Sequence, residues 1–251
     1  MRFKDKVAVI TGATAGIGHA AALAFAREGA KLALIGSSEV KEGCYKELDD
    51  TNAEYITLKV DVSNEEAIRQ AIEEIYSRFN NIDILVNCAG IVIPGSLETS
   101  TAEQMDLTLA VNVKGLFLMS KYTVEKMCKA RGGVVVNISS SVAIKGVKDR
   151  ITYTASKGAV LSMTRAMAAE YMQDNIRFNC ICPGTTHTPS LNGRIAAFDD
   201  AKQAMKDFID RQPMKRLGMP EEIAESILFA SDDKVTFLNG AVISIDGGMT
   251  V

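Results

Sequence analysis

Tyr153 and Lys157 are the two residues whose types and spacing most clearly suggest chemistry. They stand four positions apart in Tyr153-Thr154-Ala155-Ser156-Lys157, so on a helix they share one face. A phenol ionises at about pH 10 when unperturbed, and a nearby cation favours its ionised form. Such a tyrosine can give or take a proton near neutral pH. The pattern also occurs by chance, so a surface Tyr/Lys pair is the alternative interpretation.

Two further polar residues could complete this site. Ser140 lies in Ser139-Ser140-Ser141, thirteen residues before Tyr153, and its hydroxyl could hydrogen-bond a carbonyl oxygen as charge develops there. The alternative is a serine-rich loop that caps local backbone groups. Asn112 falls inside a helical pattern, where asparagine is a poor helix former, and we therefore expect it to have a structural or catalytic reason.

A glycine-rich turn at 11–18 could bind phosphate. It reads Thr11-Gly12-Ala13-Thr14-Ala15-Gly16-Ile17-Gly18, after an apolar strand and before a helix. Glycines let backbone N–H groups approach a pyrophosphate, and a helix N-terminus adds partial positive charge. The spacing is G-x-x-x-G-x-G rather than G-x-G-x-x-G, and a tight turn without a ligand is the alternative. Small residues at 87–90, Asn-Cys-Ala-Gly, could leave room for a flat ligand.

A regular alternation of strands and helices must position these residues. Hydrophobic patterns predict strands at 7–11, 31–35, 55–60, 82–87, 134–138, 176–182 and 241–245. They predict helices at 16–28, about 39–50, 64–79, about 102–130, 153–172, about 191–209 and 220–230. Ser63 should cap the third helix, with Glu66 completing a capping box. Seven strands alternating with helices predict a doubly wound, parallel α/β sheet, which binds ligands beyond the carboxyl ends of its strands.

Composition narrows the classes of function. A chain of 251 residues fits a single domain. The net charge is −3, without a basic block, so we expect neither nucleic acid nor anionic membrane as a partner. Five cysteines, none spaced C-x-x-C, and two histidines make a zinc site unexpected. The apolar stretches are too short to cross a membrane, and there is no signal-peptide pattern, so we expect a soluble cytoplasmic protein.

Taken together, these motifs resemble the short-chain dehydrogenase/reductase superfamily over essentially the whole chain. The resemblance is carried by the turn at 11–18, Asp61-Val62, 87–90, Asn112, Ser140, Tyr153, Lys157, Pro183-Gly184, Thr188 and Asp246-Gly247-Gly248. It implies one Rossmann domain spanning 1–251. It also implies an NAD(P)-dependent oxidoreductase that moves a hydride between a nicotinamide cofactor and a carbonyl or secondary alcohol. Relatives of this kind are usually homotetramers built through two long helices, here 102–130 and 153–172.

The resemblance also implies roles for single residues. Tyr153 would exchange the proton at the substrate oxygen, and Lys157 would favour the phenolate and hold the nicotinamide ribose. Ser140 would polarise the carbonyl, and Asn112 would hold a water that links Lys157 to solvent. The cofactor would lie against Gly12, Thr14, Ala15, Gly16, Ile17, Gly18, Ser37, Ser38, Asp61, Val62, Asn87, Ala89, Gly90, Tyr153, Lys157, Pro183, Gly184, Thr186 and Thr188.

The chain departs from the family pattern in two places. Cys88 stands where a second asparagine is common, and we expect little harm because cysteine is small and tolerates burial. Gly36, with Ser37 and Ser38 after it, stands where NAD-preferring relatives carry an acid at the end of strand two. Because no carboxylate there repels a 2′-phosphate, NADP is favoured over NAD. Glu39 is the residue that could reverse this preference.

The substrate is the least determined feature. The stretches 145–150 and 183–191 resemble a branch that includes type 2 3-hydroxybutyrate and sugar-acid dehydrogenases, which suggests that Arg150 and Arg194 bind a carboxylate. Solvated surface arginines are the alternative. His187 is a further candidate for substrate binding, and the segment of about 185–215 is the expected lid. The alternative functions are a reductase of 3-oxoacyl groups on a carrier protein and a non-catalytic nucleotide sensor.

Overall fold

The computed structural model describes residues 1–39 and 44–251. A seven-stranded sheet runs through its centre, with every strand parallel to its neighbours and the order β3-β2-β1-β4-β5-β6-β7. The strands are β1 Val7–Thr11, β2 Lys31–Gly36, β3 Tyr55–Lys59, β4 Ile84–Asn87, β5 Gly133–Ile138, β6 Ile176–Pro183 and β7 Val242–Ile245. The predicted doubly wound α/β class is confirmed, and the predicted strand ends differ by one or two residues.

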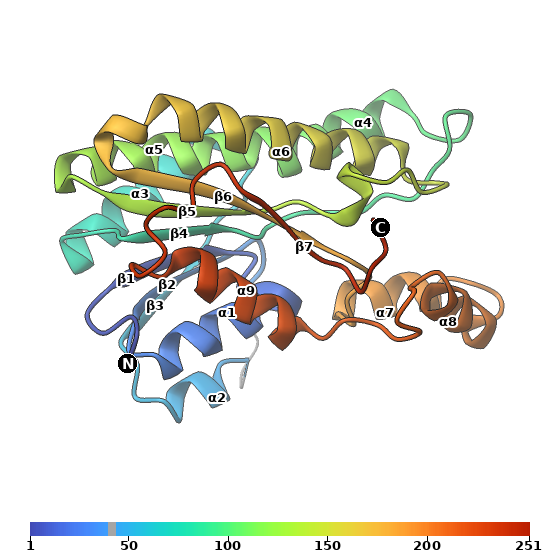
Figure 1. Ribbon diagram of the computed structural model, residues 1–251, viewed down its shortest axis with the longest axis horizontal. Helices are drawn as coiled ribbons and strands as arrows, with labels where there is room; N and C mark the ends of the chain where they lie inside the picture. The colour runs from blue at the N-terminus through green and yellow to red at the C-terminus, as the bar shows by residue number, and fades with distance from the viewer. Residues whose placement is uncertain (40–43) are drawn as a thin grey trace.

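Helices cover both faces of this sheet (Figure 1). One face carries α3 Glu65–Phe79, α4 Ala102–Leu109, α5 Leu116–Ala130 and α6 Ile151–Glu170. The other carries α1 Gly16–Arg27, α2 Lys46–Asp49 and α9 Pro220–Ser231. Two more helices, α7 Pro189–Ala196 and α8 Ala201–Asp210, lie together beyond one end of the sheet.

The central strands are apolar at consecutive positions because both of their faces are buried. All five residues of β1 are buried. Ile10 belongs to the core beneath α1 and α9, whereas its neighbour Val9 belongs to the core beneath α3 and α5. Across the described residues, no helix combines the length and apolar character needed to cross a membrane.

The predicted helix at 102–130 is continuous in space but changes its hydrogen-bond pattern. A π-helical segment, Ala110–Gly115, joins α4 to α5. Asn112 lies within it. π-Helical segments occur mostly as single turns within α-helices, and frequently at functional sites. The change from α-helical to π-helical hydrogen bonding therefore falls at the asparagine for which we expected a special role.

Two predictions about helix starts were wrong. The helix expected at 39–50 is the single turn α2, which buries only Leu48; positions 40–43 of that prediction lie outside the described residues. Asn64 caps α3 instead of Ser63, since its Oδ1 accepts from Ala67 N–H (3.1 Å). Ser63 is held by Asp61, to whose Oδ1 both its N–H and its hydroxyl donate. Glu66 binds Arg69 and forms no capping box.

The helix predicted at 191–209 is two helices. Thr188 caps α7 by accepting from Leu191 N–H (3.2 Å), and Pro189 takes its first position. Asp200 then caps α8 by accepting from Gln203 N–H (2.9 Å). An aspartate at this position starts a new helix, and the chain turns there. This turn folds the predicted lid back on itself.

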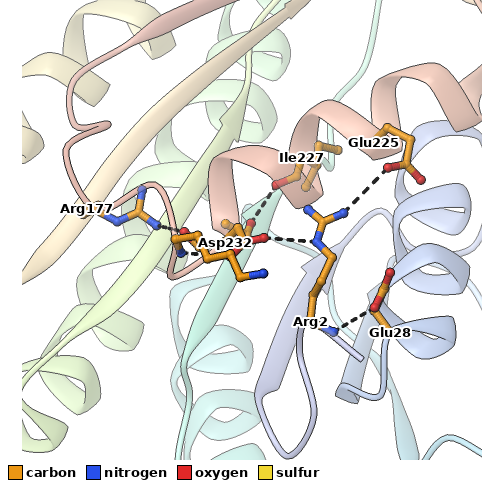
Figure 2. Close-up of polar contacts among 8 residues, drawn as sticks. Arg2, Glu28, Arg177, Glu225, Ile227 and Asp232 are labelled. Atoms are coloured by element: carbon orange, nitrogen blue, oxygen red, sulfur yellow. Dashed lines mark hydrogen bonds and ion pairs between the residues drawn. The ribbon is translucent and has the colours of Figure 1, made fainter.

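An arginine pair fixes the end of the sheet remote from the carboxyl ends of the strands (Figure 2). Arg177, buried on β6, donates to the carbonyl oxygens of Ala230 and Asp232 (both 3.1 Å). Arg2 donates through Nε to the carboxylate of Asp232 (3.1 Å), and its backbone N–H donates to Glu28 (2.8 Å). The end of α9 is thereby tied both to the sheet and to the N-terminal segment.

Candidate active site

The glycine-rich turn meets the loop after β4 at the carboxyl edge of the sheet. Thr11 Oγ1 accepts from the backbone N–H groups of Cys88 and Ala89 (both 3.0 Å). A Cβ on Gly18 would lie 2.3 Å from the carbonyl oxygen of Gly12, so only glycine allows the turn to close this tightly. Ala15 stands at the N-cap of α1 with no hydrogen-bonding side chain. The first N–H groups of the helix therefore stay open to a ligand, which fits the pyrophosphate of a dinucleotide.

Tyr153 and Lys157 lie on one face of α6, as their spacing predicts. Lys157 Nζ is 5.7 Å from the centre of the Tyr153 ring. The lysine is 5% exposed and donates to the carbonyl oxygen of Ile138 (2.8 Å) at the end of β5. Burying an ammonium group is costly unless partners surround it. This cation is therefore held in place beside the phenol, where it can stabilise negative charge on the ring oxygen.

Ser140 lies at the start of the loop that follows β5. Its Oγ accepts from Val142 N–H (3.3 Å), and the preceding Ser139 donates its hydroxyl to the carbonyl oxygen of Lys157 (2.7 Å). Together with Tyr153 and Lys157, Ser140 lines one cavity. The serine loop therefore both caps its own backbone and presents a hydroxyl beside the tyrosine.

Asn112 is buried, and its side chain hydrogen-bonds to the backbone of Ile91 and to the side chain of Ser156. Its Oδ1 accepts from Ile91 N–H (2.8 Å), and its Nδ2 donates to Ile91 O (3.0 Å) and to Ser156 Oγ (3.0 Å). Ser156 in turn donates to the carbonyl oxygen of Tyr153 (2.7 Å). The asparagine thus joins the loop after β4 to the helix that carries the tyrosine.

Asn87, predicted to bind the cofactor, and its neighbour Cys88 have different surroundings. Asn87 is buried, and its Nδ2 donates to Ser120 Oγ (3.1 Å) and Asn137 Oδ1 (2.9 Å), so its side chain serves the interior of the fold. Cys88 lines the cavity, and burial raises the pKa of its thiol to about 11 although the nearby Lys157 opposes this. The thiol is therefore neutral at physiological pH.

A cavity of about 170 Å³ brings most of the predicted chemistry together. Among the predicted residues it is lined by Ile17, Gly90, Ser140, Arg150, Tyr153, Lys157, Pro183, Gly184, Thr186, Thr188 and Arg194. Thr185 also lines it, while His187 is exposed and its backbone N–H donates to Gly218 O (2.8 Å). His187 does not line this cavity, so its part in substrate binding stays a prediction.

The other half of the predicted cofactor site follows the ends of β2 and β3. Ser37 and Ser38 are exposed there, Asp61 is exposed after β3, and Val62 is buried beneath Gly115. A Cβ on Gly36 would lie 2.6 Å from Thr14 Cγ2. Any side chain at position 36 would therefore require Thr14 of the glycine-rich turn to shift.

Lys59 is a residue at this edge that the sequence did not single out. Its Nζ forms an ion pair with Glu39 (3.2 Å), and both side chains are largely exposed. Exposed pairs of this kind contribute little to stability and exchange partners easily. Either member could therefore turn to a bound nucleotide.

Three arginines surround the cavity opening, and we call Arg150, Arg194 and Arg211 the arginine cluster. Arg150 is the N-cap of α6, Arg194 lies on α7, and Arg211 is the C-cap of α8. Burial lowers the pKa of each guanidinium group. For Arg211 burial and repulsion by the other two lower the pKa to about 10, so all three remain cationic at neutral pH.

Phe208 of α8 supports two members of the arginine cluster. Its ring centre lies 4.1 Å from Arg211 Cζ and 5.8 Å from Arg194 Cζ. An aromatic face attracts cations, which holds these side chains at the cavity without neutralising them. Arg211 was missed by sequence reasoning because one arginine among 28 basic residues gives no signal until the fold places it.

Comparisons with known proteins identify the family. A family model described as enoyl-(acyl carrier protein) reductase matches residues 12–250. An uncharacterized oxidoreductase of Thermotoga maritima is 45% identical over 253 residues, which cover 100% of this chain and 99% of that protein. The chain belongs to the short-chain dehydrogenase/reductase family.

Two further similarities agree with this membership. Dehydrogenase/reductase SDR family member 6 of Rattus norvegicus is 38% identical, covering 100% of this chain and 99% of that protein. The crystal structure of levodione reductase superposes with a TM-score of 0.95 at 33% identity, covering 99% of both chains. The predicted reaction class is confirmed: the protein is an oxidoreductase of the kind that acts on CH–OH groups. The sensor alternative is accordingly set aside.

Tyr153→Phe removes the hydroxyl and keeps the ring. Because a positioned proton donor contributes about a hundredfold to ten-thousandfold, kcat should fall about a thousandfold while the dissociation constant of the reduced cofactor stays unchanged. Steady-state kinetics on one carbonyl substrate and fluorescence titration measure the two quantities. Tyr171→Phe, at the C-cap of the same helix, is the matched control. A Tyr153→Phe protein that keeps a tenth or more of the wild-type kcat would contradict this role.

Proposed function

We propose that this enzyme transfers a hydride between NADP and the carbonyl or secondary alcohol of a small hydroxy acid, oxo acid or sugar acid. The observation that carries the proposal is the arginine cluster beside Ser140 and Tyr153 in one small cavity. Within the described residues, none of its three members forms an ion pair with a carboxylate. A bound anion would supply the missing counter-charge and accept bidentate hydrogen bonds.

The chain's own residues would perform the proton chemistry. In reduction, Ser140 and Tyr153 hydroxyls donate to the carbonyl oxygen, and Tyr153 passes its proton to that oxygen as the alcohol forms. Lys157 stabilises the resulting phenolate and binds the nicotinamide ribose, and Asn112 supports a water that returns a proton through the lysine. When bound, the nicotinamide cofactor supplies the hydride in this direction and accepts it in the other.

The same proposal treats 1–251 as one NAD(P)-binding domain whose lid spans about 185–215. Two members of the arginine cluster belong to this segment, while Arg150 belongs to the rim of the sheet. An anion bound between them would draw the lid against the cavity and exclude water. The cytoplasm is the proposed location, since all five cysteines are free thiols.

The alternative substrate, a 3-oxoacyl group on a carrier protein, is favoured less by the surface charge. A second hollow of about 940 Å³ adjoins the cavity at Val147, Arg150 and Arg211. Its lining includes four carboxylates, those of Asp149, Asp199, Asp200 and Asp207, and three cations, those of Lys148, Arg150 and Arg211. An acidic carrier would meet more like charge than opposite charge at this approach, so a small free acid is the better fit.

The substrate class can be tested with matched compounds that differ in charge. 3-Hydroxybutyrate should be oxidised with a kcat/KM at least about tenfold above that of 3-hydroxybutanamide, because hydrogen bonds to a charged group contribute about 1.5–3 kcal/mol each. The double variant Arg150→Ala/Arg194→Ala should raise KM for the acid about a hundredfold and leave cofactor affinity unchanged. Arg27→Ala, in the last turn of α1, is the control. Equal KM values for the double variant and wild type, across a panel of hydroxy and sugar acids, would refute the anion site.

NADP preference is supported by the open Ser37-Ser38 turn and by Lys59 beside it. NADPH should bind at least about tenfold more tightly than NADH when each is titrated by nicotinamide fluorescence, since a phosphate gains charge-assisted hydrogen bonds. Lys59→Ala should weaken NADPH alone, whereas Lys129→Ala, on the exposed face of α5, should change neither. Tight binding of NADH alone would mean that Glu39 takes the ribose hydroxyl and that NAD is the cofactor.

A homotetramer is the proposed assembly. Large apolar side chains are exposed on the long helices, at Leu107 of α4 and Phe117 of α5, and near the other edge at Phe229 and Phe237. Exposed apolar side chains at two separate places on the surface allow two isologous interfaces, as a tetramer of this symmetry requires. Light scattering should give four times the chain mass of 27.0 kDa. Phe117→Lys should lower that mass, Phe198→Lys on the lid should not, and a monomeric wild type would contradict the assembly.

A further inference from the structure

Thr185 joins the lid to the carboxyl edge of the sheet and takes part in none of the steps above. It follows Pro183-Gly184 at the end of β6, and its backbone carbonyl accepts from Gly218 N–H (3.0 Å). Its hydroxyl oxygen accepts two side-chain hydrogen bonds, from Arg211 Nη2 (3.1 Å) and from Gln212 Nε2 (2.8 Å). One oxygen on the sheet side thus holds two neighbouring residues of the lid.

Gln212, the second residue bound to Thr185, is buried and is connected through further contacts to the serine loop at 139–141. Gln212 is 2% exposed, and its Nε2 also lies 3.7 Å from Met249 Sδ. Met249 in turn accepts from Ser141 Oγ (3.3 Å), next to Ser140. The buried Gln212 therefore holds Thr185 Oγ1 in place, and this oxygen can restrain the more exposed Arg211.

Arg211 requires a partner that restrains its side chain. Its guanidinium is repelled by Arg150 and Arg194 across the cavity opening, and an unrestrained side chain would rotate away toward solvent. The Phe208 ring, whose centre lies 4.1 Å from Arg211 Cζ, holds the guanidinium against its face by attracting the cation. The Thr185 hydrogen bond restrains the guanidinium at Nη2, and the other N–H groups are available to a ligand.

We propose that Thr185 is a positioning residue that holds Arg211 in the orientation in which the arginine cluster binds a substrate anion. The proposal rests on the proposed function, because it assumes that an anion occupies the cluster. Thr185 acts through Arg211, whereas the reacting oxygen is left to Ser140 and Tyr153.

Three substitutions at this position separate the hydroxyl oxygen from the bulk of the side chain. Thr185→Val keeps the shape and removes the acceptor, Thr185→Ala removes the acceptor with less bulk, and Thr185→Ser restores it. The probe is malonate, titrated by calorimetry into enzyme saturated with NADP. Thr185→Val and Thr185→Ala should raise the malonate dissociation constant about tenfold, the size expected for one lost hydrogen bond to a charged group, and Thr185→Ser should match wild type. NADPH affinity and the thermal midpoint show that the variants are folded.

A double-mutant cycle with Arg211→Ala tests the route of the effect. If Thr185 works through the arginine, Thr185→Val has no further effect on malonate binding once Arg211 is absent. The inference is overturned if Thr185→Val binds malonate like wild type, or if its loss is equally large in the Arg211→Ala background. If Arg211→Ala and Arg150→Ala/Arg194→Ala all bind malonate like wild type, the anion site itself is wrong. A loss with the arginine variants alone leaves the anion site standing and removes only the role of Thr185.

Discussion

The reversal of strand order between β1 and β4 is the constraint on which the rest of the site depends. Because every strand is parallel, each one ends at the same edge, and the loops after β1 and β4 leave in opposite directions from neighbouring positions. The Thr11 hydroxyl binds both of these loops together through Cys88 and Ala89. The turn at 11–18 is thereby fixed against the small residues at 88–90, and a flat ligand can lie across the two.

The fold buries the charged group of Lys157 at a position that is unfavourable for stability. A buried ammonium group with one carbonyl partner, Ile138 O, is poorly compensated by the protein. Its remaining donors suit the phenolate of Tyr153 and the hydroxyls of a bound ribose. The π-helical segment at Asn112 is a second local departure from regular structure beside the same lysine. Departures of this kind concentrate at sites that serve a ligand, which agrees with the family's chemistry.

Much of the fold and of the arrangement of the candidate site could be predicted because both depend on local patterns. Apolar runs of strand length located the sheet, and Tyr153 and Lys157 share a face through spacing alone. The prediction was less good where two local signals compete: Asp200 starts a second helix within a stretch that reads as one, and Asn64 rather than Ser63 caps α3 because Asp61 holds the serine. In each case several nearby side chains could accept a hydrogen bond from the backbone N–H at the helix start, and the folded structure decides which of them does.

Arg211 and Lys59 could not be predicted for a different reason. Neither has a neighbour in sequence that distinguishes it from other basic residues, and each gains its partners only through folding: Phe208 and Thr185 for the arginine, Glu39 for the lysine. From a single sequence, the spacing of residues along one helix or strand can be predicted well, whereas contacts between different helices and strands cannot. The residues proposed to decide cofactor and substrate choice belong to the second group.

The distribution of charge explains how a chain with a net charge of −3 could bind the proposed anionic substrate. The aspartates of the outer hollow are largely on exposed loops and helix ends, where salt screens their field within about 10 Å. The arginine cluster is partly buried around a small cavity, where screening is weaker and each guanidinium acts at short range. A small anion that enters the cavity therefore leaves the weak, screened repulsion of the aspartates and gains the close attraction of the arginine cluster. A large acidic partner would stay in contact with the aspartates outside. Selection by size and selection by charge thus come from the same arrangement of side chains.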